Sequence, residues 1–229
     1  MKINVLTVAI LSICLSGCVG TLLEPVPLSN NDRAQFLSAE PVVVTMQKTP
    51  GFLFNTPAGA LVNAGTATWL KPEEAPSWPR ITAQYGIPDF TDAVRSKFVS
   101  SLERSLGPRS IETAADRLPF SEKQEFGYVA RYDADYVLEF RTQYGSFHYL
   151  PLQWKTYAMN CTGQARIIRV SDQQVVWNAT CSVGASDNPS LKVPAKDFLE
   201  GDGKLLKQAA TFVTDSCTDQ LLGQFVSAN

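Results

Sequence analysis

WKTYAMNCTGQARIIRVSDQQVVWNATCSV, residues 154–183, contains two long runs of strand-forming residues separated by a short polar turn. Residues 154–170 and 174–183 are rich in β-branched and aromatic side chains, which favour extended backbone. The three residues between them, 171–173, are Ser, Asp and Gln, a polar combination that suits a chain reversal. The stretch therefore predicts two antiparallel strands.

Alternate positions of these two strands carry apolar or small side chains, so one face of the pair is apolar. The positions are Cys161, Gly163, Ala165 and Ile167 on the first strand and Val175, Trp177, Ala179, Cys181 and Val183 on the second. An apolar face of a sheet must be covered, and helices are the expected cover here.

Two stretches have the periodicity of helices with one apolar stripe. The first follows Asp89, a suitable N-cap, and ends before Gly107-Pro108; its stripe is Phe90, Val94, Phe98, Leu102 and Leu106. The second starts at Asp202; its stripe is Leu206, Ala210, Val213, Cys217, Leu221 and either Gln224 or Phe225. Both helices are expected to lie on the apolar face of the sheet.

Further elements complete the predicted fold. Residues 42–46 and 135–140 read as strands, and residues 120–129 as a short helical piece. The order of strands and helices predicts an α+β fold, with a mixed or mainly antiparallel sheet and helices packed on one face. We expect a single domain over residues 42–229.

The first 17 residues have the layout of an export signal. Lys2 is followed by an apolar run at 3–15 and then by small residues that lead to Cys18. A membrane-spanning helix needs about 20 apolar residues, and this run is shorter. We expect residues 1–17 to be removed as a signal peptide.

Leu15-Ser16-Gly17-Cys18 resembles the lipobox of bacterial lipoproteins. The resemblance implies that the thiol of Cys18 carries a diacylglycerol and that Cys18 becomes the first residue of the mature chain. Val19 stands where an Asp is the usual signal for retention in the inner membrane, which implies the periplasmic face of the outer membrane. The alternative is a plain secretory signal, with Cys18 an ordinary thiol.

Residues 18–41 are polar and marked by prolines, which predicts an extended tether between lipid and domain. Lys2 is the only charged residue of the signal, so the mature chain keeps 22 acidic residues and all but one of the 20 basic ones. Because nucleic-acid binding depends on an excess of Lys and Arg, we expect no nucleic-acid partner.

Three cysteines, Cys161, Cys181 and Cys217, remain once Cys18 is acylated. Exported proteins mature in an oxidising compartment, so a disulfide is expected. Cys161 and Cys181 are the first choice because they share one face of neighbouring strands; Cys217 with either is the alternative. The chain has no CxxC and one histidine, so we expect neither a metal nor a cofactor.

Two segments are candidates for partner contact. No charged residue occurs between residues 49 and 70, where Phe52, Leu53, Phe54 and Leu61 are candidate contacts; the aromatic stretch 144–157 adds Tyr149 and Trp154. The alternative for the first segment is a buried connection, and for the second ordinary strand packing.

Candidate catalytic groups are few. His148 is the single histidine, and no Gly-x-Ser-x-Gly motif accompanies it. Asp133, Asp135 and Glu139 share strand parity, but solvated carboxylates are more common than a catalytic pair. Residues 201–204 lack the first glycine of a phosphate-binding loop. We expect no enzyme; a periplasmic hydrolase, or a carrier of a lipid or small apolar ligand with a cavity of about 300 Å³ or more, is the alternative.

The order of elements, with Ala134-Asp135-Tyr136-Val137-Leu138 and Gln174-Val175-Val176-Trp177, resembles periplasmic α+β lipoproteins of envelope transport and secretion. The curli-secretion lipoprotein and the amino-terminal domain of TolB share this architecture. The resemblance implies a non-enzymatic accessory or assembly component of an envelope complex, with a protein partner in the envelope.

Overall fold

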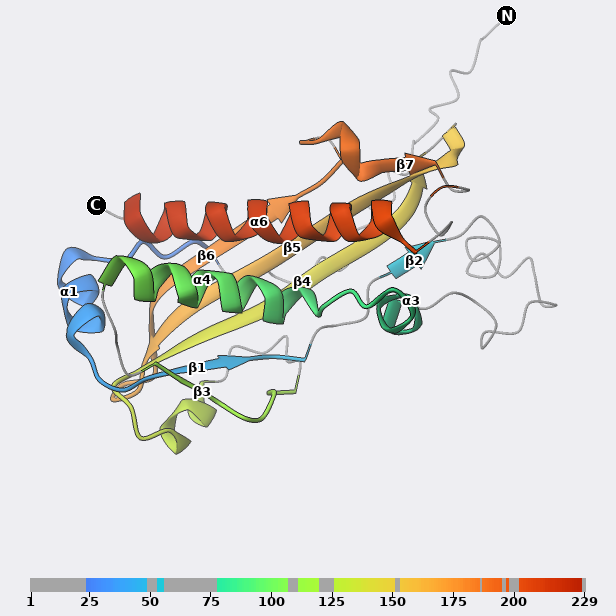
Figure 1. Ribbon diagram of the computed structural model, residues 1–229. Helices are drawn as coiled ribbons and strands as arrows, with labels where there is room; N and C mark the ends of the chain where they lie inside the picture. The colour runs from blue at the N-terminus through green and yellow to red at the C-terminus, as the bar shows by residue number, and fades with distance from the viewer. Residues whose placement is uncertain are drawn as a thin grey trace, which may run out of the picture.

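The computed structural model contains a mixed sheet with two long helices on one face (Figure 1). It describes residues 24–48, 53–55, 78–106, 111–119, 126–150, 153–185, 187–194, 197 and 202–227. Over these residues the α+β class and the placement of the helices on one face of the sheet are confirmed.

The sheet has the strand order β3-β1-β4-β5-β6, with β2 paired to β4 and β7 paired to β5 outside this path. The strands are β1 (Val42–Met46), β2 (Leu53–Asn55), β3 (Ile111–Thr113), β4 (Tyr136–Leu150), β5 (Gln153–Arg169), β6 (Gln174–Val183) and β7 (Lys192–Pro194). β1 runs parallel to β3 and β4, whereas β4, β5 and β6 are antiparallel.

β4 and β5 are long strands, with 15 and 17 residues. Because a typical strand has about 5–6 residues, this pair reaches well beyond an ordinary sheet. It extends past the start of helix α6 in Figure 1. β5 and β6 meet at residues 171–173, as predicted.

The described helices are α1 (Asn30–Ser38), α3 (Trp78–Tyr85), α4 (Phe90–Leu106) and α6 (Lys204–Ser227), with 3₁₀ turns η2 (Gly127–Arg131) and η3 (Pro189–Leu191). Asp89 caps α4 as predicted, since its Oδ1 accepts the N–H of Asp92 at 3.1 Å. Of the predicted helical piece at 120–129, residues 120–125 lie outside the described residues, and the rest includes the start of η2.

Aromatic rings join α4 and α6 to the sheet. Phe98 of α4 is fully buried, and its ring centroid lies 5.4 Å from that of Phe140 and 6.0 Å from those of Trp177 and Phe225. Burying four such side chains gives a large hydrophobic stabilisation, and edge-to-face contacts add to it. The predicted apolar stripes of both helices thus form the main core.

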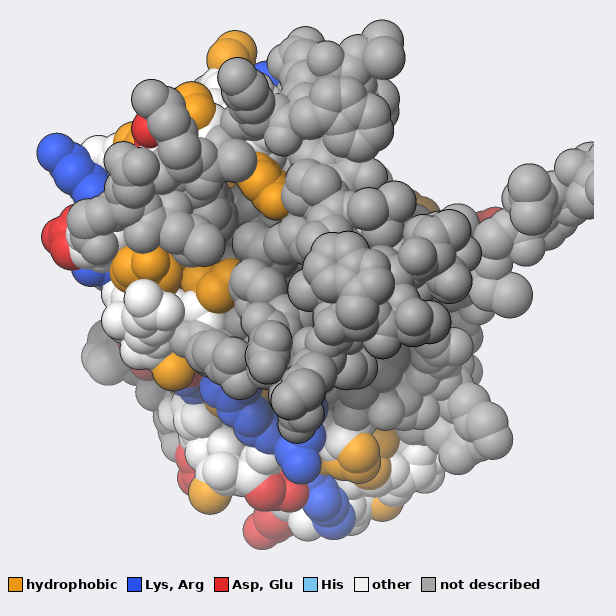
Figure 2. All heavy atoms as spheres, turned by 90° about the vertical axis from the view of Figure 1, so that its right-hand side faces the viewer, with side chains coloured by type: hydrophobic (Ala, Val, Ile, Leu, Met, Phe, Trp, Pro, Cys, Tyr) orange, Lys and Arg blue, Asp and Glu red, His pale blue; other side chains and the backbone are white. Residues whose placement is uncertain are grey.

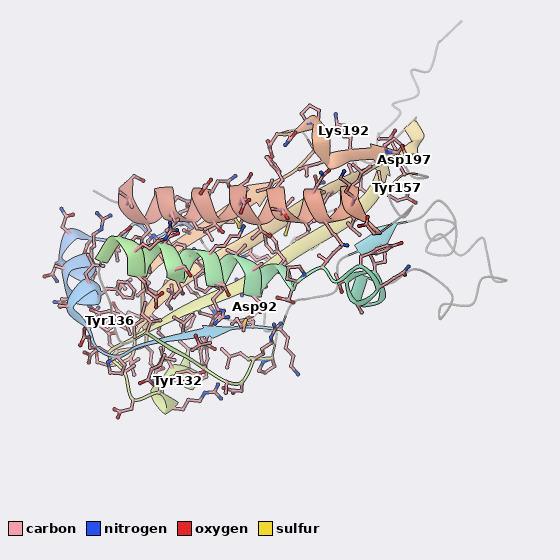
Figure 3. All side chains as sticks on the ribbon, in the orientation of Figure 1. Asp92, Tyr132, Tyr136, Tyr157, Lys192 and Asp197 are labelled. Atoms are coloured by element: carbon pink, nitrogen blue, oxygen red, sulfur yellow. A yellow bond between two sulfur atoms is a disulfide. The ribbon has the colours of Figure 1, made fainter. Side chains whose placement is uncertain are left out.

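The expected tether is shorter than residues 18–41. α1 packs on the domain through Phe36, which is 2% exposed and meets the rings of Phe225 and of Tyr136, which is labelled in Figure 3. Leu28 is buried as well, and Val26 exchanges two backbone hydrogen bonds with Asn178 of β6. The expectation of an extended segment is wrong for the described residues 24–41, because Phe36 anchors a mostly polar helix and Leu28 and Ala39 on either side of it are buried.

A β-bulge in β6 places one residue, Val175, on the other face of the sheet from the predicted one. Ile167 pairs with Trp177, but the next residue, Ile168, pairs with Val175, so β6 carries one extra residue. Val176 therefore joins the core beneath the helices, and Val175 packs with Ile168 on the opposite face. Val175 was expected beneath the helices; the other predicted positions of β6 lie there.

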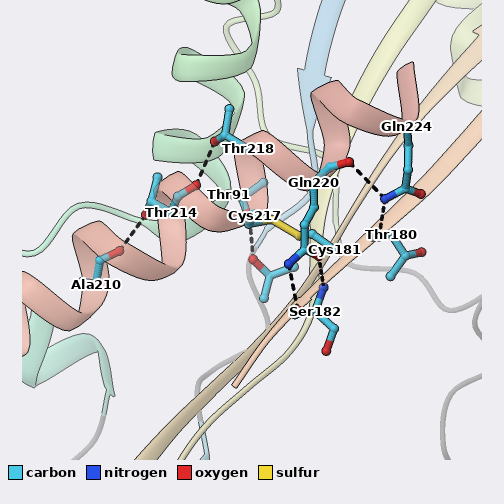
Figure 4. Close-up of a disulfide and its surroundings, with 11 residues drawn as sticks. Thr91, Thr180, Cys181, Ser182, Ala210, Thr214, Cys217, Thr218, Gln220 and Gln224 are labelled. Carbon is cyan, nitrogen blue, oxygen red and sulfur yellow. Dashed lines mark hydrogen bonds between the residues drawn. A yellow bond between two sulfur atoms is a disulfide. The ribbon is translucent and has the colours of Figure 1, made fainter. Parts of the chain in front are cut away.

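Side chains of α6 occupy the free edge of β6 (Figure 4). The amide of Gln220 accepts the N–H of Ser182 at 3.0 Å and donates to its carbonyl oxygen at 3.1 Å. Gln224 donates to the carbonyl oxygen of Thr180 at 2.9 Å. Unpaired edge groups are templates for strand addition by another chain, and these two glutamines block that contact.

Replacing Gln220 with alanine is expected to lower the free energy of unfolding by about 1 kcal/mol and to promote self-association. The reason is that the N–H and C=O of Ser182 then face solvent at a sheet edge. Sedimentation velocity and urea titration measure the two effects. Gln208→Ala, on an exposed position of the same helix, is the control; equal behaviour of both variants would contradict edge protection.

Candidate functional site

Parts of the two segments predicted to contact a partner, residues 53–55 of the first and residues 146–148 of the second, pair at one end of the sheet. Leu53 of β2 pairs with Ser146 of β4, and β2 continues alongside β4 as far as His148. Within the long pair, Tyr149 lies opposite Tyr157. We call the end formed by β2, residues 144–150 and residues 153–157 the distal end.

The structure describes the side chain of none of the six candidate contact residues. Phe52 and Leu61 lie outside the described residues, and for Leu53, Phe54, Tyr149 and Trp154 the structure describes the backbone alone. Tyr144, next to a β-bulge at the same end, is 45% exposed. Figure 2 faces this end and shows hydrophobic side chains close to Lys and Arg side chains on the described surface.

Cys181 and Cys217 form a disulfide between β6 and α6, with a Cα–Cα distance of 5.1 Å (Figure 4). The first-choice pair, Cys161 with Cys181, is wrong. The register places Gly163, not Cys161, opposite Cys181, and Cys161 opposite Val183. Cys217 reaches Cys181 from the helix above the sheet, so the alternative pairing with Cys217 is the observed one.

Gly163 makes room for this disulfide. A Cβ atom at this position would lie 3.0 Å from Sγ of Cys181 and 3.3 Å from both Sγ of Cys217 and the Phe90 ring. Any side chain on Gly163 would therefore press on the bridge. The glycine lets the disulfide sit directly on the backbone of β5.

Cys161 is a buried free thiol. Burial raises its pKa well above the ordinary value, and the nearby Asp89 adds to this effect. Because the thiolate is the reactive form, the neutral buried thiol is neither a nucleophile nor a good metal ligand. Its role is to pack the core.

The face of the sheet opposite the helices carries a buried ion pair. Arg166 Nη2 lies 2.6 Å from Oε1 of Glu139, and the two side chains are 2% and 0% exposed. Gln47 donates to the same oxygen at 2.9 Å, and Tyr128 donates to the other oxygen of the carboxylate. The carboxylate thus has a partner on both oxygens.

Further buried polar side chains on this face extend from the ion pair across the sheet to β6; together they form a polar layer. Gln164 accepts from Arg141 and, at 3.0 Å, from Gln143, and it donates to Asn178 at 2.6 Å. Burial and, to a smaller extent, the charge of the neighbouring Arg166 lower the pKa of Arg141 to about 10, although Glu139 opposes this shift. These side chains connect β4, β5 and β6 through buried hydrogen bonds.

Arg166 is the least satisfied member of this layer. Its Nε and Nη1 have no hydrogen-bond partner among the described residues, and its guanidinium stacks on the ring of Phe126 at 4.6 Å. Sequence reasoning missed the ion pair. The usable signal was the charged or amide side chains at alternating positions of two strands, Glu139 and Arg141 on one and Gln164 and Arg166 on the other.

The carboxylates considered together in the sequence do not form one site. Asp133 and Asp135 are exposed, whereas Glu139 is buried and paired with Arg166. Burial raises the pKa of Glu139, and Arg166 opposes that rise. The charge of Arg166 is the main compensation for the buried carboxylate.

His148 contacts a serine but lies in no triad within the described part of the chain. Its Nδ1 is 3.2 Å from Oγ of Ser146, and no carboxylate contacts the ring among the described residues. Ser146 is fully buried, so its hydroxyl cannot meet a substrate in this conformation. The hydrolase alternative has no assembled nucleophile here.

The described residues include neither a metal-binding cluster nor a membrane-spanning helix. No group of three or more His, Cys, Asp or Glu side chains is placed to hold a metal ion there. None of the helices in those ranges is long and apolar enough to cross a membrane.

The fold and site define a single-domain α+β protein whose C-terminal helix is joined to the sheet by a disulfide. No family model matches the chain, and no curated protein matches it. Solved structures do match. One is the PelC dodecamer from Paraburkholderia phytofirmans, with 13% identity, a TM-score of 0.34 and coverage of 80% of this chain and 85% of that one.

Two further solved structures are similar to a comparable degree. A protein from Xanthomonas campestris has 17% identity and a TM-score of 0.36 and covers 82% of this chain and 88% of its own. A lipoprotein from Neisseria meningitidis has 13% identity and a TM-score of 0.23 and covers 76% of this chain and 97% of its own. At these TM-scores the likenesses carry no conclusion about function.

Proposed function

We propose that the chain is a lipoprotein on the periplasmic face of the outer membrane, anchored by an acylated Cys18. Its work is non-enzymatic: it is an accessory or assembly component of an envelope transport or secretion complex. Residues 1–17 are the signal peptide in this proposal, and the domain presents its distal end to an envelope partner.

The disulfide between Cys181 and Cys217 is the observation that carries this proposal. Stable disulfides belong to oxidising compartments such as the periplasm. The bridge lies in the interior of a domain whose chain starts with an export-type sequence ending at Cys18. Export and lipidation at the lipobox-like stretch account for both features.

The position of Val26 limits how far the domain can lie from the membrane in this proposal. Val26 is hydrogen-bonded to β6 and lies eight positions after Cys18 in the sequence. A fully extended chain spans at most about 3.6 Å per residue, so the domain stays within about 29 Å of the lipid. A protein held so close to a membrane suits work on other envelope components.

Metabolic labelling with a palmitate analogue tests the anchor. The native chain is expected to incorporate the label and to fractionate with the outer membrane, whereas Cys18→Ser abolishes both because the acylated thiol is absent. Cys161→Ser, which changes a buried thiol, is the matched control and should keep the label. Equal labelling of native chain and Cys18→Ser would refute the anchor.

Affinity purification from detergent-solubilised envelopes tests the partner. The native chain should recover an envelope protein in stoichiometric amount, and Leu61→Asp or Trp154→Ala should lose it. Val226→Asp, at an exposed apolar position near the C-terminal end of α6, is the control and should keep it. Recovery of the chain alone from envelopes that contain the lipidated protein would count against an assembly role.

A further inference from the structure

A cavity of about 330 Å³ lies between the beginnings of α4 and α6. Both helices start at the same end of the sheet, the end at which the β4–β5 pair extends beyond α6 (Figure 1). The lining comes from the loop before α4, which includes Ile87, from α4 and α6, and from Met159 of β5.

Small side chains on the two helices leave this space open. Ala93 of α4 and Ala210 of α6 line the cavity where larger residues would fill it, and Met159 of β5 and Phe90 contribute apolar surface. An engineered apolar cavity of about 150 Å³ binds benzene, so this one has room for a longer apolar chain.

The polar side chains of the cavity lining are two lysines and two threonines. Among the described residues that line it, Lys97 and Lys207 are the charged ones, with side chains 46% and 45% exposed. The hydroxyl of Thr214 donates to the carbonyl oxygen of Ala210 at 2.9 Å. The cavity therefore combines an apolar interior with two half-exposed ammonium groups.

Both lysines have carboxylate neighbours outside the cavity lining. Lys97 pairs with Asp215, while Nζ of Lys207 is 4.0 Å from Asp202, at the limit of an ion pair. Exposed pairs of this kind contribute little to stability, so an anionic ligand can compete for the ammonium groups at small cost. Lys207 has the looser partner and is the better placed to bind an anion.

We propose that this cavity binds the acyl chain of a single-chain amphiphile with an anionic head group, such as a medium-chain fatty carboxylate. The chain lies among Ile87, Phe90 and Met159, and the head group lies between Lys97 and Lys207. This binding activity goes beyond the accessory function proposed above and does not depend on it.

Titration calorimetry with decanoate tests the proposal on the full chain carrying Cys18→Ser, which has no acyl group of its own. Decanoate is expected to bind at one site and decanol more weakly, because the alcohol lacks a charge for the lysines. The proposal is overturned if this chain, whose cavity residues are unchanged, binds no decanoate at concentrations below micelle formation.

Matched variants locate the site. Ala210→Leu and, separately, Ala93→Leu fill the cavity and should weaken decanoate binding by about tenfold or more, whereas Ala130→Leu, at an exposed position of η2, should not. Lys207→Met should weaken decanoate but not decanol, with the exposed Lys204→Met as its control. Unchanged affinity in both cavity-filling variants, or equal affinity for decanoate and decanol, would overturn it; circular dichroism checks that each variant is folded.

Discussion

Replacing Arg166 with methionine is expected to lower the free energy of unfolding by about 3–5 kcal/mol. The substitution leaves the carboxylate of Glu139 buried, with only the neutral donors Gln47 and Tyr128 on its two oxygens. A buried charge without its counter-ion costs several times more than a surface ion pair contributes. Urea titration of native chain and variant measures the difference.

The loss in Arg166→Met should also depend on pH. Burial raises the pKa of Glu139 in the folded chain, and without Arg166 only the smaller effects of Arg141 and of the Gln47 hydrogen bond oppose that rise. A raised folded-state pKa means that the folded form binds the proton more tightly than the unfolded form, so the variant loses stability as pH rises. The deficit should be smaller at about pH 5 than at about pH 8.

Two controls separate this effect from the loss of a long side chain. Arg131→Met breaks an exposed ion pair with Asp116, whose side chains are 45% and 61% exposed, and should cost less than about 1 kcal/mol. Adding Glu139→Leu to Arg166→Met should restore part of the stability and remove the pH dependence. An Arg166→Met variant as stable as Arg131→Met would contradict the assigned role.

Replacing Gly163 with valine should lower the free energy of unfolding by about 3 kcal/mol and impair formation of the disulfide. The valine Cβ would lie 3.0 Å from Sγ of Cys181 and 3.3 Å from Sγ of Cys217, and its methyl groups need further space. Either the helix moves away from the sheet or the bridge fails to close. Thiol alkylation under denaturing conditions and thermal unfolding measure both effects.

Gly223→Val is the matched control for this prediction. Gly223 lies in α6, and a Cβ there would meet nothing within 4 Å. Valine has a slightly better helix propensity than glycine, so the control should be neutral or gain a few tenths of a kcal/mol. A Gly163→Val chain with a complete disulfide and native stability would show that the layer between α6 and β5 is more adaptable than its geometry indicates.

The elements with strong local signals were predictable from sequence. The apolar stripe of α4, its cap at Asp89, and the stripe of α6 all depend on residues within a few turns of one another. The β5–β6 pair follows from its composition and the turn at 171–173. In each case the physical cause lies within the segment itself.

The features of the candidate site depended on contacts between distant segments. The juxtaposition of β2 with residues 146–148 required the pairing of strands far apart in sequence, and composition alone could not supply that register. The same holds for α1, whose packing rests on Phe36 among mostly polar neighbours. Its composition indicated a tether because one aromatic contact leaves little trace in a helix pattern.

The sequence by itself determined the α+β class, the helix stripes and the strand faces up to the β-bulge at Val175, because the apolar periodicity of each segment dictates which side it must bury. It also supplies the export-type stretch that ends at Cys18, which remains a prediction. Only the tertiary structure decided that Cys181 pairs with Cys217 and that Glu139 is neutralised by Arg166. Those pairings depend on strand register and on where α6 crosses the sheet, and both are set by packing between segments that local patterns do not encode.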